Sequence, residues 1–206
     1  KWRNFSINDV YEPGSTFKII NAAIGLEENV VTPNSQFYCS GYVRQVKSGK
    51  PIKCWRYYNP HGSQNFAEGV QNSCNVVFVD VGLRVGAEKM YEYIKAFGFG
   101  ELTGVPFTGE SPGIIPSSAQ AIKDVNLATI SFGQGIAVTP IQLVTAISAV
   151  ANGGNLMVPR IVKELVDEEG NVVHAYEPEV KRKVLSEETS KTMMQILESV
   201  VSNGTG

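Results

Sequence analysis

The stretch from Gly14 to Asn29 constrains the fold more than any other part of this sequence. Its apolar residues, among them Phe17, Ile20 and Leu26, are spread around the helical axis instead of forming one stripe. A helix that is apolar on nearly every side must be buried, so the rest of the chain has to fold around it. Pro13-Gly14 marks the turn into this helix, which places Ser15 at its N-terminus.

Length and composition are sufficient for such a core. The chain has 206 residues, of which 43% are hydrophobic and 18% charged. These values fit one globular domain, or most of a larger one. A formal net charge of −2 gives no reason to expect nucleic acid as a partner. No run reaches the roughly 18 apolar residues typical of a membrane span.

The remaining pattern mixes helices with a hairpin and predicts the α+β class. Thr139 is a good N-cap with Pro140 at the first helical position, and Ser186 caps a last helix that ends at Asn203-Gly204. Residues 98–123 form a loop-rich stretch. We expect helices over 66–71, 76–84, 87–97 and 140–151, and a β-hairpin formed by 160–166 and 171–175 around Glu168-Glu169-Gly170.

An irregular excursion interrupts this regular pattern between residues 33 and 75. Its first part is rich in Pro, Gly, Ser, Asn and aromatic residues, with short strand-like pieces such as Gly41–Val46. A segment of this composition cannot bury much of a core, so it needs another source of stability.

Three cysteines and a histidine lie in this excursion. Cys39, Cys54 and Cys74 cannot all pair with one another within one chain, and together with His61 they form a full tetrahedral ligand set for a structural Zn²⁺. The spacing is wider than in zinc fingers, so the alternative of free thiols, or of one disulfide between Cys39 and Cys54, stays open. His174 lies in the predicted hairpin, and we expect it to be exposed and without a role.

Ser15 and Lys18 are candidates for nucleophile and base. Residues three apart share one face of a helix, so the hydroxyl and the amine can approach each other. A serine hydroxyl needs a base, and burial can lower the pKa of a lysine enough for it to serve. Backbone N–H groups at the same helix end can stabilise an oxyanion. The alternative is an ordinary N-cap serine with a solvated lysine.

Ser73 and Asn75 lie in a break between two helical stretches, where side chains can project into a cleft. Ser-x-Asn accompanies Ser-x-x-Lys in penicillin-recognising enzymes, although turn chemistry explains such residues equally well in isolation. Cys74 separates the two residues. A zinc ion bound to Cys74 would therefore hold this second motif in position.

Taken together, the motifs resemble those of class B penicillin-binding proteins, and within that class the stage V sporulation protein D group. The resemblance spans nearly the whole chain. It rests on Tyr11-Glu12-Pro13-Gly14-Ser15-Thr16-Phe17-Lys18, Gln71-Asn72-Ser73-Cys74-Asn75, Ser131-Phe132-Gly133-Gln134-Gly135, Val138-Thr139-Pro140-Ile141-Gln142, Ala151-Asn152-Gly153-Gly154, and the segments 185–190 and 197–201.

The resemblance implies the penicillin-binding fold and a D,D-transpeptidase that cross-links peptidoglycan stem peptides in sporulation or division. Ser15 would attack the acyl-D-Ala-D-Ala carbonyl with Lys18 as base. Ser73 and Asn75 would relay a proton and hold the substrate amide. β-Lactams would acylate the same serine. Related enzymes with acidic, cysteine or histidine ligands at similar intervals also favour the structural zinc site.

The resemblance further implies parts beyond this chain. Lys-Thr-Gly, the third motif of such enzymes, does not occur in the sequence. We therefore expect residues 1–206 to be a partial transpeptidase domain that is inactive alone. An N-terminal membrane anchor and a pedestal domain would complete a single-pass protein with an extracytoplasmic catalytic domain. A glycosyltransferase of the SEDS type would be its membrane partner.

Two other functions remain compatible with the motifs. A β-lactamase or D,D-carboxypeptidase uses the same serine and lysine but transfers the acyl group to water, and the motifs place no deacylating carboxylate here. A non-catalytic, zinc-stabilised module that senses penicillin or serves as a scaffold would explain the absent third motif.

Overall fold

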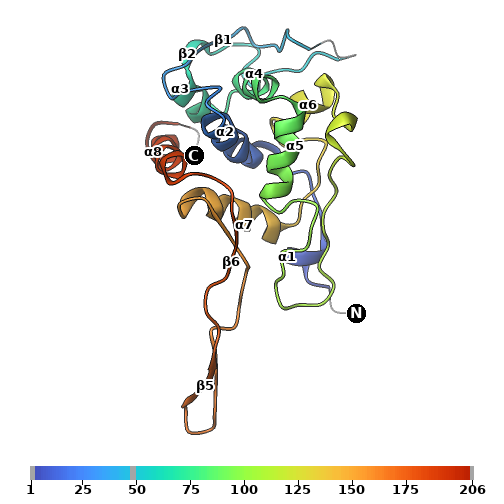
Figure 1. The fold of residues 1–206 in the computed structure, drawn as a ribbon. Helices are drawn as coiled ribbons and strands as arrows, with labels where there is room; N and C mark the ends of the chain where they lie inside the picture. The colour runs from blue at the N-terminus through green and yellow to red at the C-terminus, as the bar shows by residue number, and fades with distance from the viewer. Residues whose placement is uncertain (1–2, 47–49, 205–206) are drawn as a thin grey trace.

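The computed structural model describes residues 3–46 and 50–204 and shows a helical body with one long projecting arm (Figure 1). The helices cluster around α2, and the arm extends away from them. The helices of the described chain are α1 Phe5–Asn8, α2 Lys18–Glu27, α3 Phe66–Gln71, α4 Asn75–Val85, α5 Ala87–Ala96, α6 Asp124–Ile130, α7 Pro140–Ala151 and α8 Glu187–Asn203, with 3₁₀ turns η1 Gly14–Phe17 and η2 Ala119–Ala121.

Strands in the described chain form antiparallel pairs only. Helices combined with antiparallel strands confirm the predicted α+β class. The pairs are β1 Gln36–Cys39 with β2 Gly62–Asn65, β3 Asn155–Met157 with β6 Val180–Lys183, and β4 Glu164–Val166 with β5 Val172–Ala175.

Helix α2 is the buried centre that its sequence predicts. Ile20, Ala23 and Ile24 are fully buried, and α2 packs against α4, α7 and α8. Gly25 permits the close approach to α4, because a Cβ atom there would lie 2.7 Å from Val81 Cγ1. Each side chain of α2 therefore has little freedom to move, which fixes the direction of the turn that precedes it.

Asn21 is a fully buried polar residue inside this core. Its Nδ2 donates to the carbonyl oxygens of Phe78 in α4 and Ser131 at the end of α6, each at 2.9 Å. One side chain therefore connects three helices by hydrogen bonds. Because a buried amide without partners is costly, these bonds favour one arrangement of the helices over others.

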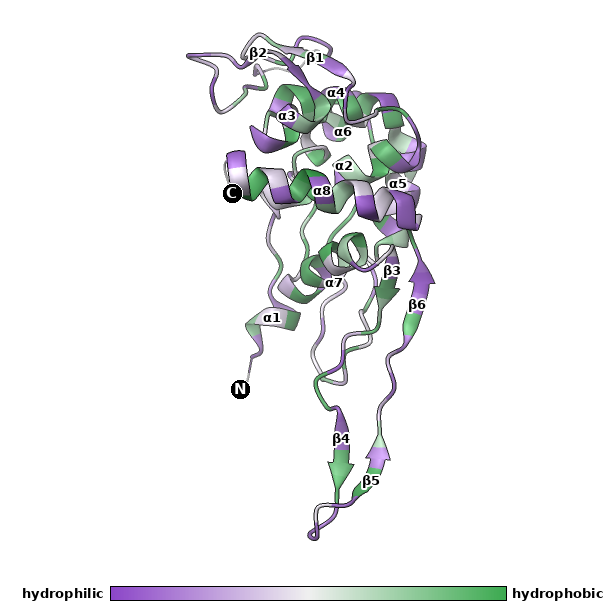
Figure 2. Ribbon diagram, turned by 90° about the vertical axis from the view of Figure 1, so that its left-hand side faces the viewer, coloured by the Kyte–Doolittle hydropathy of each residue, from purple (hydrophilic) through white to green (hydrophobic). Residues whose placement is uncertain are grey.

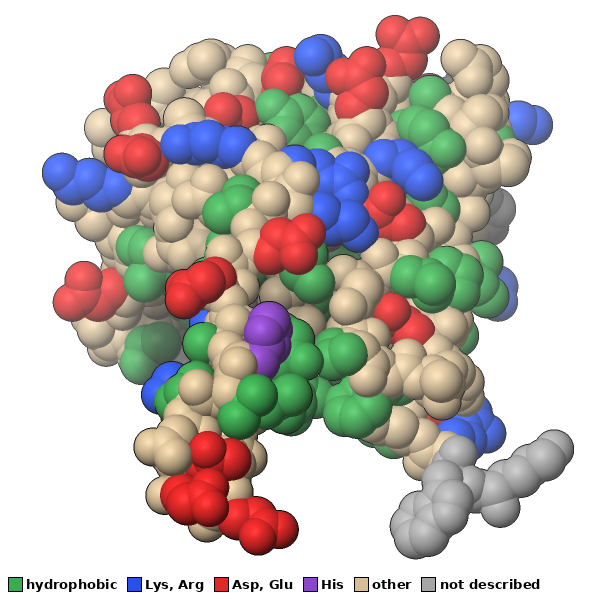
Figure 3. All heavy atoms as spheres, turned by 60° about the horizontal axis from the view of Figure 1, so that its bottom comes forward, with side chains coloured by type: hydrophobic (Ala, Val, Ile, Leu, Met, Phe, Trp, Pro, Cys, Tyr) green, Lys and Arg blue, Asp and Glu red, His purple; other side chains and the backbone are tan. Residues whose placement is uncertain are grey.

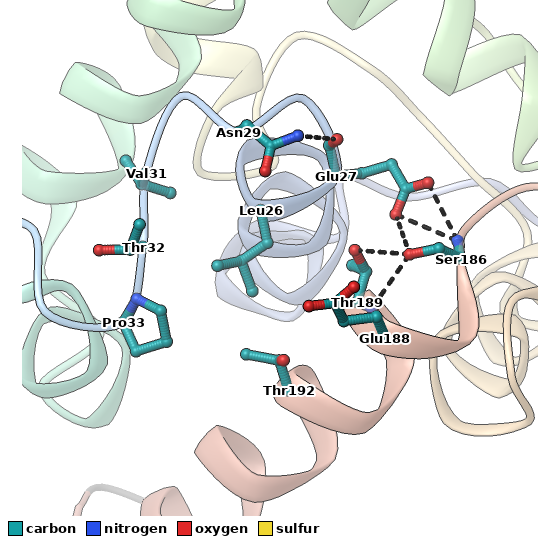
Figure 4. A pocket seen from close by; sticks show the side chains of 10 residues that line it. All are labelled: Leu26, Glu27, Asn29, Val31, Thr32, Pro33, Ser186, Glu188, Thr189 and Thr192. Carbon is teal, nitrogen blue, oxygen red and sulfur yellow. Dashed lines mark hydrogen bonds between the residues drawn. The ribbon is translucent and has the colours of Figure 1, made fainter.

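A second polar contact joins α2 to α8 (Figure 4). The Glu27 carboxylate accepts hydrogen bonds from the backbone N–H of Ser186 at 3.0 and 3.1 Å and from its hydroxyl at 2.9 Å. Ser186 also caps α8 by accepting from the N–H of Thr189, as the sequence predicts. A cavity of about 410 Å³ lies beside this contact, and neither Ser15 nor Lys18 lines it.

The arm consists of β4, β5 and the segments that lead to them. All side chains of β4 and β5 are exposed, and green apolar patches alternate with purple polar ones along the arm (Figure 2). Asn171 donates through its N–H and Nδ2 to the Asp167 carboxylate at 2.7 and 3.0 Å, which closes the turn and lowers the pKa of Asp167. Figure 3 shows acidic side chains gathered at the end of this projection. His174 is exposed, as expected.

Most predicted helices are confirmed, and two of them, residues 66–71 and 140–151, have the predicted bounds. The predicted hairpin is confirmed with shorter strands. Gly41–Val46 is not a strand; it contributes only an isolated bridge from Tyr42 to Lys53. Helix α6 was not predicted. None of the described helices combines the length and the apolar character needed to cross a membrane.

Replacing Asn21 tests the polar link between the helices. We expect Asn21→Leu to lower the free energy of unfolding by about 2 kcal/mol, because it removes two buried hydrogen bonds while keeping the branching of the side chain. Gln36→Ala is the matched control, since the exposed Gln36 amide also donates to a carbonyl oxygen, that of Asn34. It should cost less than about 0.5 kcal/mol. Urea denaturation measures both; equal losses would contradict the structural role of Asn21.

Candidate functional site

Ser15 lies in a 3₁₀ turn that leads directly into α2. Gly14 before it has φ +58°, a left-handed conformation that glycine adopts without strain, and the Ser15 side chain is exposed. The Ser15 hydroxyl makes no hydrogen bond with another described residue. One helical turn later the backbone enters the core, so Lys18 is 3% exposed. A free hydroxyl at the surface and a buried amine thus face the same region.

The Lys18 amine contacts the second predicted motif. Nζ donates to the Ser73 carbonyl oxygen at 2.7 Å and to Ser73 Oγ at 2.9 Å. Burial lowers the pKa of Lys18 to about 8, although the nearby thiols of Cys54 and Cys74 act in the opposite direction. A lysine with this pKa is partly neutral near physiological pH and can accept a proton.

Ser73 has an unusual backbone conformation. Its φ is 47°, and among the described residues only Asn29 shares a positive φ without being glycine. A serine in the left-handed region costs on the order of 1–3 kcal/mol. The N–H groups of Ser73 and Cys74 donate to the carbonyl oxygens of Val70 and Gly69 at 2.9 and 3.0 Å, which hold the turn after α3.

Asn75 begins α4 just beyond this turn. Its Nδ2 donates to the carbonyl oxygen of Lys53 at 2.9 Å, so the excursion orients the amide from the outside. Lys53 is a residue that sequence reasoning did not single out. In the sequence, Lys53 is one of several cations in an irregular segment, and no pattern connects it to Asn75.

The loop Ser131–Gly135 holds the turn that carries Ser15. The Gly14 N–H donates to the Gly133 carbonyl oxygen at 2.9 Å, and the Gly135 N–H donates to Glu12 Oε1 at 2.8 Å. A Cβ atom on Gly133 would lie 2.0 Å from the Gly14 carbonyl oxygen, so no larger residue fits. The sequence showed this loop as part of a motif without indicating that it supports the turn.

Two cavities meet at Ser15. One, of about 290 Å³, contains Lys18 and Ser73 among its lining residues, and its other walls are mainly apolar, with Phe78 and Leu197 among them. The other, of about 490 Å³, has a more polar lining. Its wall includes Ser15, Asn75, Lys50, Lys53, Thr129, Phe132 and Gln134. The structure thus brings Ser15, Lys18, Ser73 and Asn75 together around these cavities.

The four predicted metal ligands also come together. The ligand atoms of Cys39, Cys54, His61 and Cys74 all lie within 4.8 Å of one another, and the three cysteines are buried free thiols. Cys54 Sγ lies 3.5 Å from His61 Nδ1 and 3.9 Å from Cys74 Sγ. Ligands of one tetrahedral zinc lie about 3.6 Å apart for a sulfur and a nitrogen and about 3.8 Å apart for two sulfurs, so this cluster could hold a metal.

The thiols differ in acidity. The hydrogen bond between the two sulfur atoms lowers the pKa of Cys54 to about 5, and the same bond together with burial raises the pKa of Cys74. One thiolate is therefore already favoured at neutral pH, which suits the binding of a soft cation. The cluster is linked to the second motif in two ways. Cys74 lies between Ser73 and Asn75, and Cys54 follows Lys53, whose carbonyl oxygen accepts a hydrogen bond from Asn75.

Curated relatives share this sequence over almost its full length. Stage V sporulation protein D of Bacillus subtilis is 47% identical over 206 residues, covering 99% of this chain and 31% of that protein. The penicillin-binding protein PbpB of Mycolicibacterium smegmatis is 32% identical, over 96% of this chain and 30% of that protein. The chain therefore spans about a third of the length of these relatives.

Solved structures share the fold. The D,D-transpeptidase domain of a peptidoglycan glycosyltransferase from Eggerthella lenta matches with a TM-score of 0.90 at 25% identity, covering 99% of this chain and 52% of that one. Penicillin binding protein 3 from Mycobacterium tuberculosis, complexed with aztreonam, matches with a TM-score of 0.87 at 28% identity, covering 100% and 46%. The penicillin binding protein transpeptidase domain family matches residues 1–206, so the resemblance is confirmed and the chain belongs to this family.

Proposed function

We propose that the protein containing this chain is a peptidoglycan D,D-transpeptidase that works through an acyl-serine intermediate. The observation that carries the proposal is the buried Lys18 amine, which is bonded to Ser73 and lines the same cavity as the exposed Ser15. A general base with a lowered pKa next to a free hydroxyl is the arrangement that acyl transfer requires. The aztreonam complex of a structural neighbour supports the same inference.

In the proposed reaction, Ser15 Oγ attacks the carbonyl carbon of the penultimate D-Ala in a donor stem peptide. Lys18 accepts the hydroxyl proton, and Ser73 passes a proton to the departing terminal D-Ala as the C–N bond breaks. The N–H groups at the start of α2 stabilise the negative charge that develops on the carbonyl oxygen. The amine of an acceptor peptide then attacks the ester, and Ser15 recovers its proton. Asn75 orients the peptide amide.

β-Lactams would form a stable ester with the same serine. We expect benzylpenicillin to add its mass to the full-length protein, because its ring opens on Ser15 and no placed carboxylate hydrolyses the product. Ser15→Ala should abolish the adduct, whereas the exposed Ser117→Ala should leave it intact. Intact-mass spectrometry provides the measurement. An adduct that persists in Ser15→Ala would disprove the assignment, and rapid release of penicilloate would favour a hydrolase.

The rate of this acylation should depend on the protonation of Lys18. Only the neutral amine accepts a proton, so below its pKa of about 8 the acylation rate should rise nearly tenfold per pH unit and then level off above that value. Penicillin acylation followed from about pH 6 to about pH 9 in the full-length protein tests this expectation. A rate that stays flat across this range would exclude Lys18 as the base.

We further propose that Cys39, Cys54, His61 and Cys74 hold a structural Zn²⁺. The close set of three sulfurs and one nitrogen supports this assignment, and four protein ligands leave no position for substrate. The bound ion would join β1, the start of α4 and the loop around His61. It would thereby limit movement of Ser73 and Asn75 without contacting the substrate.

Metal removal should therefore destabilise the protein and slow its acylation. We expect about one zinc per chain by elemental analysis, since the cluster holds one tetrahedral set of ligands. Cys39→Ser should lose the metal and lower the melting temperature, because binding energy of a structural zinc is folding energy. His174→Ala is the control, since that histidine lies in the exposed arm. A metal-free protein with an unchanged melting temperature would rule the site out.

The cellular setting follows from the same proposal. A transpeptidase that acts on peptidoglycan works outside the cytoplasmic membrane, in sporulation or in division. We propose an N-terminal anchor in that membrane and a glycosyltransferase of the SEDS type as partner. The 47% identity to a sporulation protein supports the first of these two processes.

A further inference from the structure

The polar cavity beside Ser15 has a wall that the proposed chemistry does not use. This wall is formed by Lys50 to Lys53 within the excursion, and Thr129 and Gln134 also line the cavity. No lining residue of the cavity is acidic. The cavity therefore has a positive side close to the serine that the substrate must reach.

The Lys53 side chain is held in place by aromatic rings. Its Nζ lies 4.5 Å from the ring centroid of Tyr57 and 5.9 Å from that of Tyr42. The backbones of Tyr42 and Lys53 also pair in an isolated antiparallel bridge. Contact with aromatic faces restricts the lysine while leaving its ammonium able to donate hydrogen bonds to a ligand.

The surrounding sequence offers this cation no carboxylate as a counter-ion. From Asn29 to Ala67 the chain contains no aspartate or glutamate. In the described part of the chain, no carboxylate forms an ion pair with Lys53. The basic residues of the same segment are Arg44, Lys47, Lys50, Lys53 and Arg56.

We propose that Lys53 binds a carboxylate of the donor stem peptide and so selects acidic donors. This inference rests on the transpeptidase function proposed above. The donor carbonyl must lie at Ser15, so the residues before the scissile bond extend into one of the two adjoining cavities. A carboxylate loses less hydration energy in the polar cavity than against Phe78 and Leu197, which directs the acidic part of the peptide towards Lys53.

Lys53 also positions the amide of Asn75, the neighbouring group that would recognise the peptide. Its carbonyl oxygen accepts from Asn75 Nδ2, its side chain contacts the Tyr57 ring, and the residue lines the cavity that Ser15 and Asn75 also line. A peptide bound along this wall would meet the Asn75 amide and then the Lys53 ammonium. Lys53 is thus a specificity-determining residue. A change of its side chain leaves the backbone contact to Asn75 in place.

The experiment combines a charge change in the protein with a charge change in the substrate. Two synthetic donors ending in D-Ala-D-Ala are compared, one with a free carboxylate on a preceding residue and one with that carboxylate amidated. Release of D-Ala by the full-length protein gives kcat/KM for each donor. Lys53→Gln should reduce kcat/KM for the carboxylate donor about fivefold, as expected for one solvent-accessible charge pair. The kcat/KM of Lys53→Gln for the amidated donor should stay within about twofold of the value for the parent protein.

Two further variants separate the specific contact from general charge. Arg44→Gln removes a cation from the same excursion, but Arg44 does not line the cavity with Ser15. It should leave the preference between the donors unchanged. Lys53→Arg keeps the charge and should retain most of the preference. The melting temperature of each variant shows whether the fold is kept.

Each other outcome is decisive. Equal losses on both donors would mean that Lys53 acts through Asn75 and not through a carboxylate, and no loss on either would exclude a role for its ammonium. If Arg44→Gln weakened the preference for the carboxylate donor as much as Lys53→Gln does, the preference would arise from general electrostatic attraction and the proposed contact would be wrong. If the parent protein forms no penicillin adduct on Ser15 and releases no D-Ala from either donor, the transpeptidase function fails, and this inference fails with it.

Discussion

The contact between the Lys18 amine and Ser73 is the interaction on which the site depends. It connects two segments that are 55 residues apart in the sequence and meet only because α2 is buried against α4. A charged ammonium in this position would be costly, and the low pKa of Lys18 follows from that cost. The same burial that organises the fold therefore prepares the lysine to accept a proton.

The elements around this contact support it from several directions. The Gly133 carbonyl oxygen holds the turn before Ser15, and the Lys53 carbonyl oxygen holds the amide of Asn75. The cysteine and histidine cluster joins the excursion to the start of α4. The geometry of the site is therefore set jointly by packing, by backbone hydrogen bonds and by a candidate metal site.

Much of this arrangement could be predicted from the sequence, because it depends on local patterns. The apolar periodicity of α2, the cap at Thr139 and the serine cap of α8 are local signals, and the structure confirms the elements that they predicted. The association of four distant ligands was predicted from their chemistry together with the resemblance to related enzymes. Helix α6 was missed because Asp124–Ile130 is short and follows a loop. The contact between Lys53 and Asn75 could not be predicted, since it is made by the backbone carbonyl oxygen of Lys53, and a backbone carbonyl has no signature in sequence.

The left-handed conformation of Ser73 has an evolutionary consequence. Glycine or asparagine would adopt this φ at a lower energetic cost. Selection on the backbone energy of this turn alone would therefore favour losing the hydroxyl. Its retention would be an example of the trade-off between stability and activity, in which a protein keeps a strained residue because its chemistry is needed.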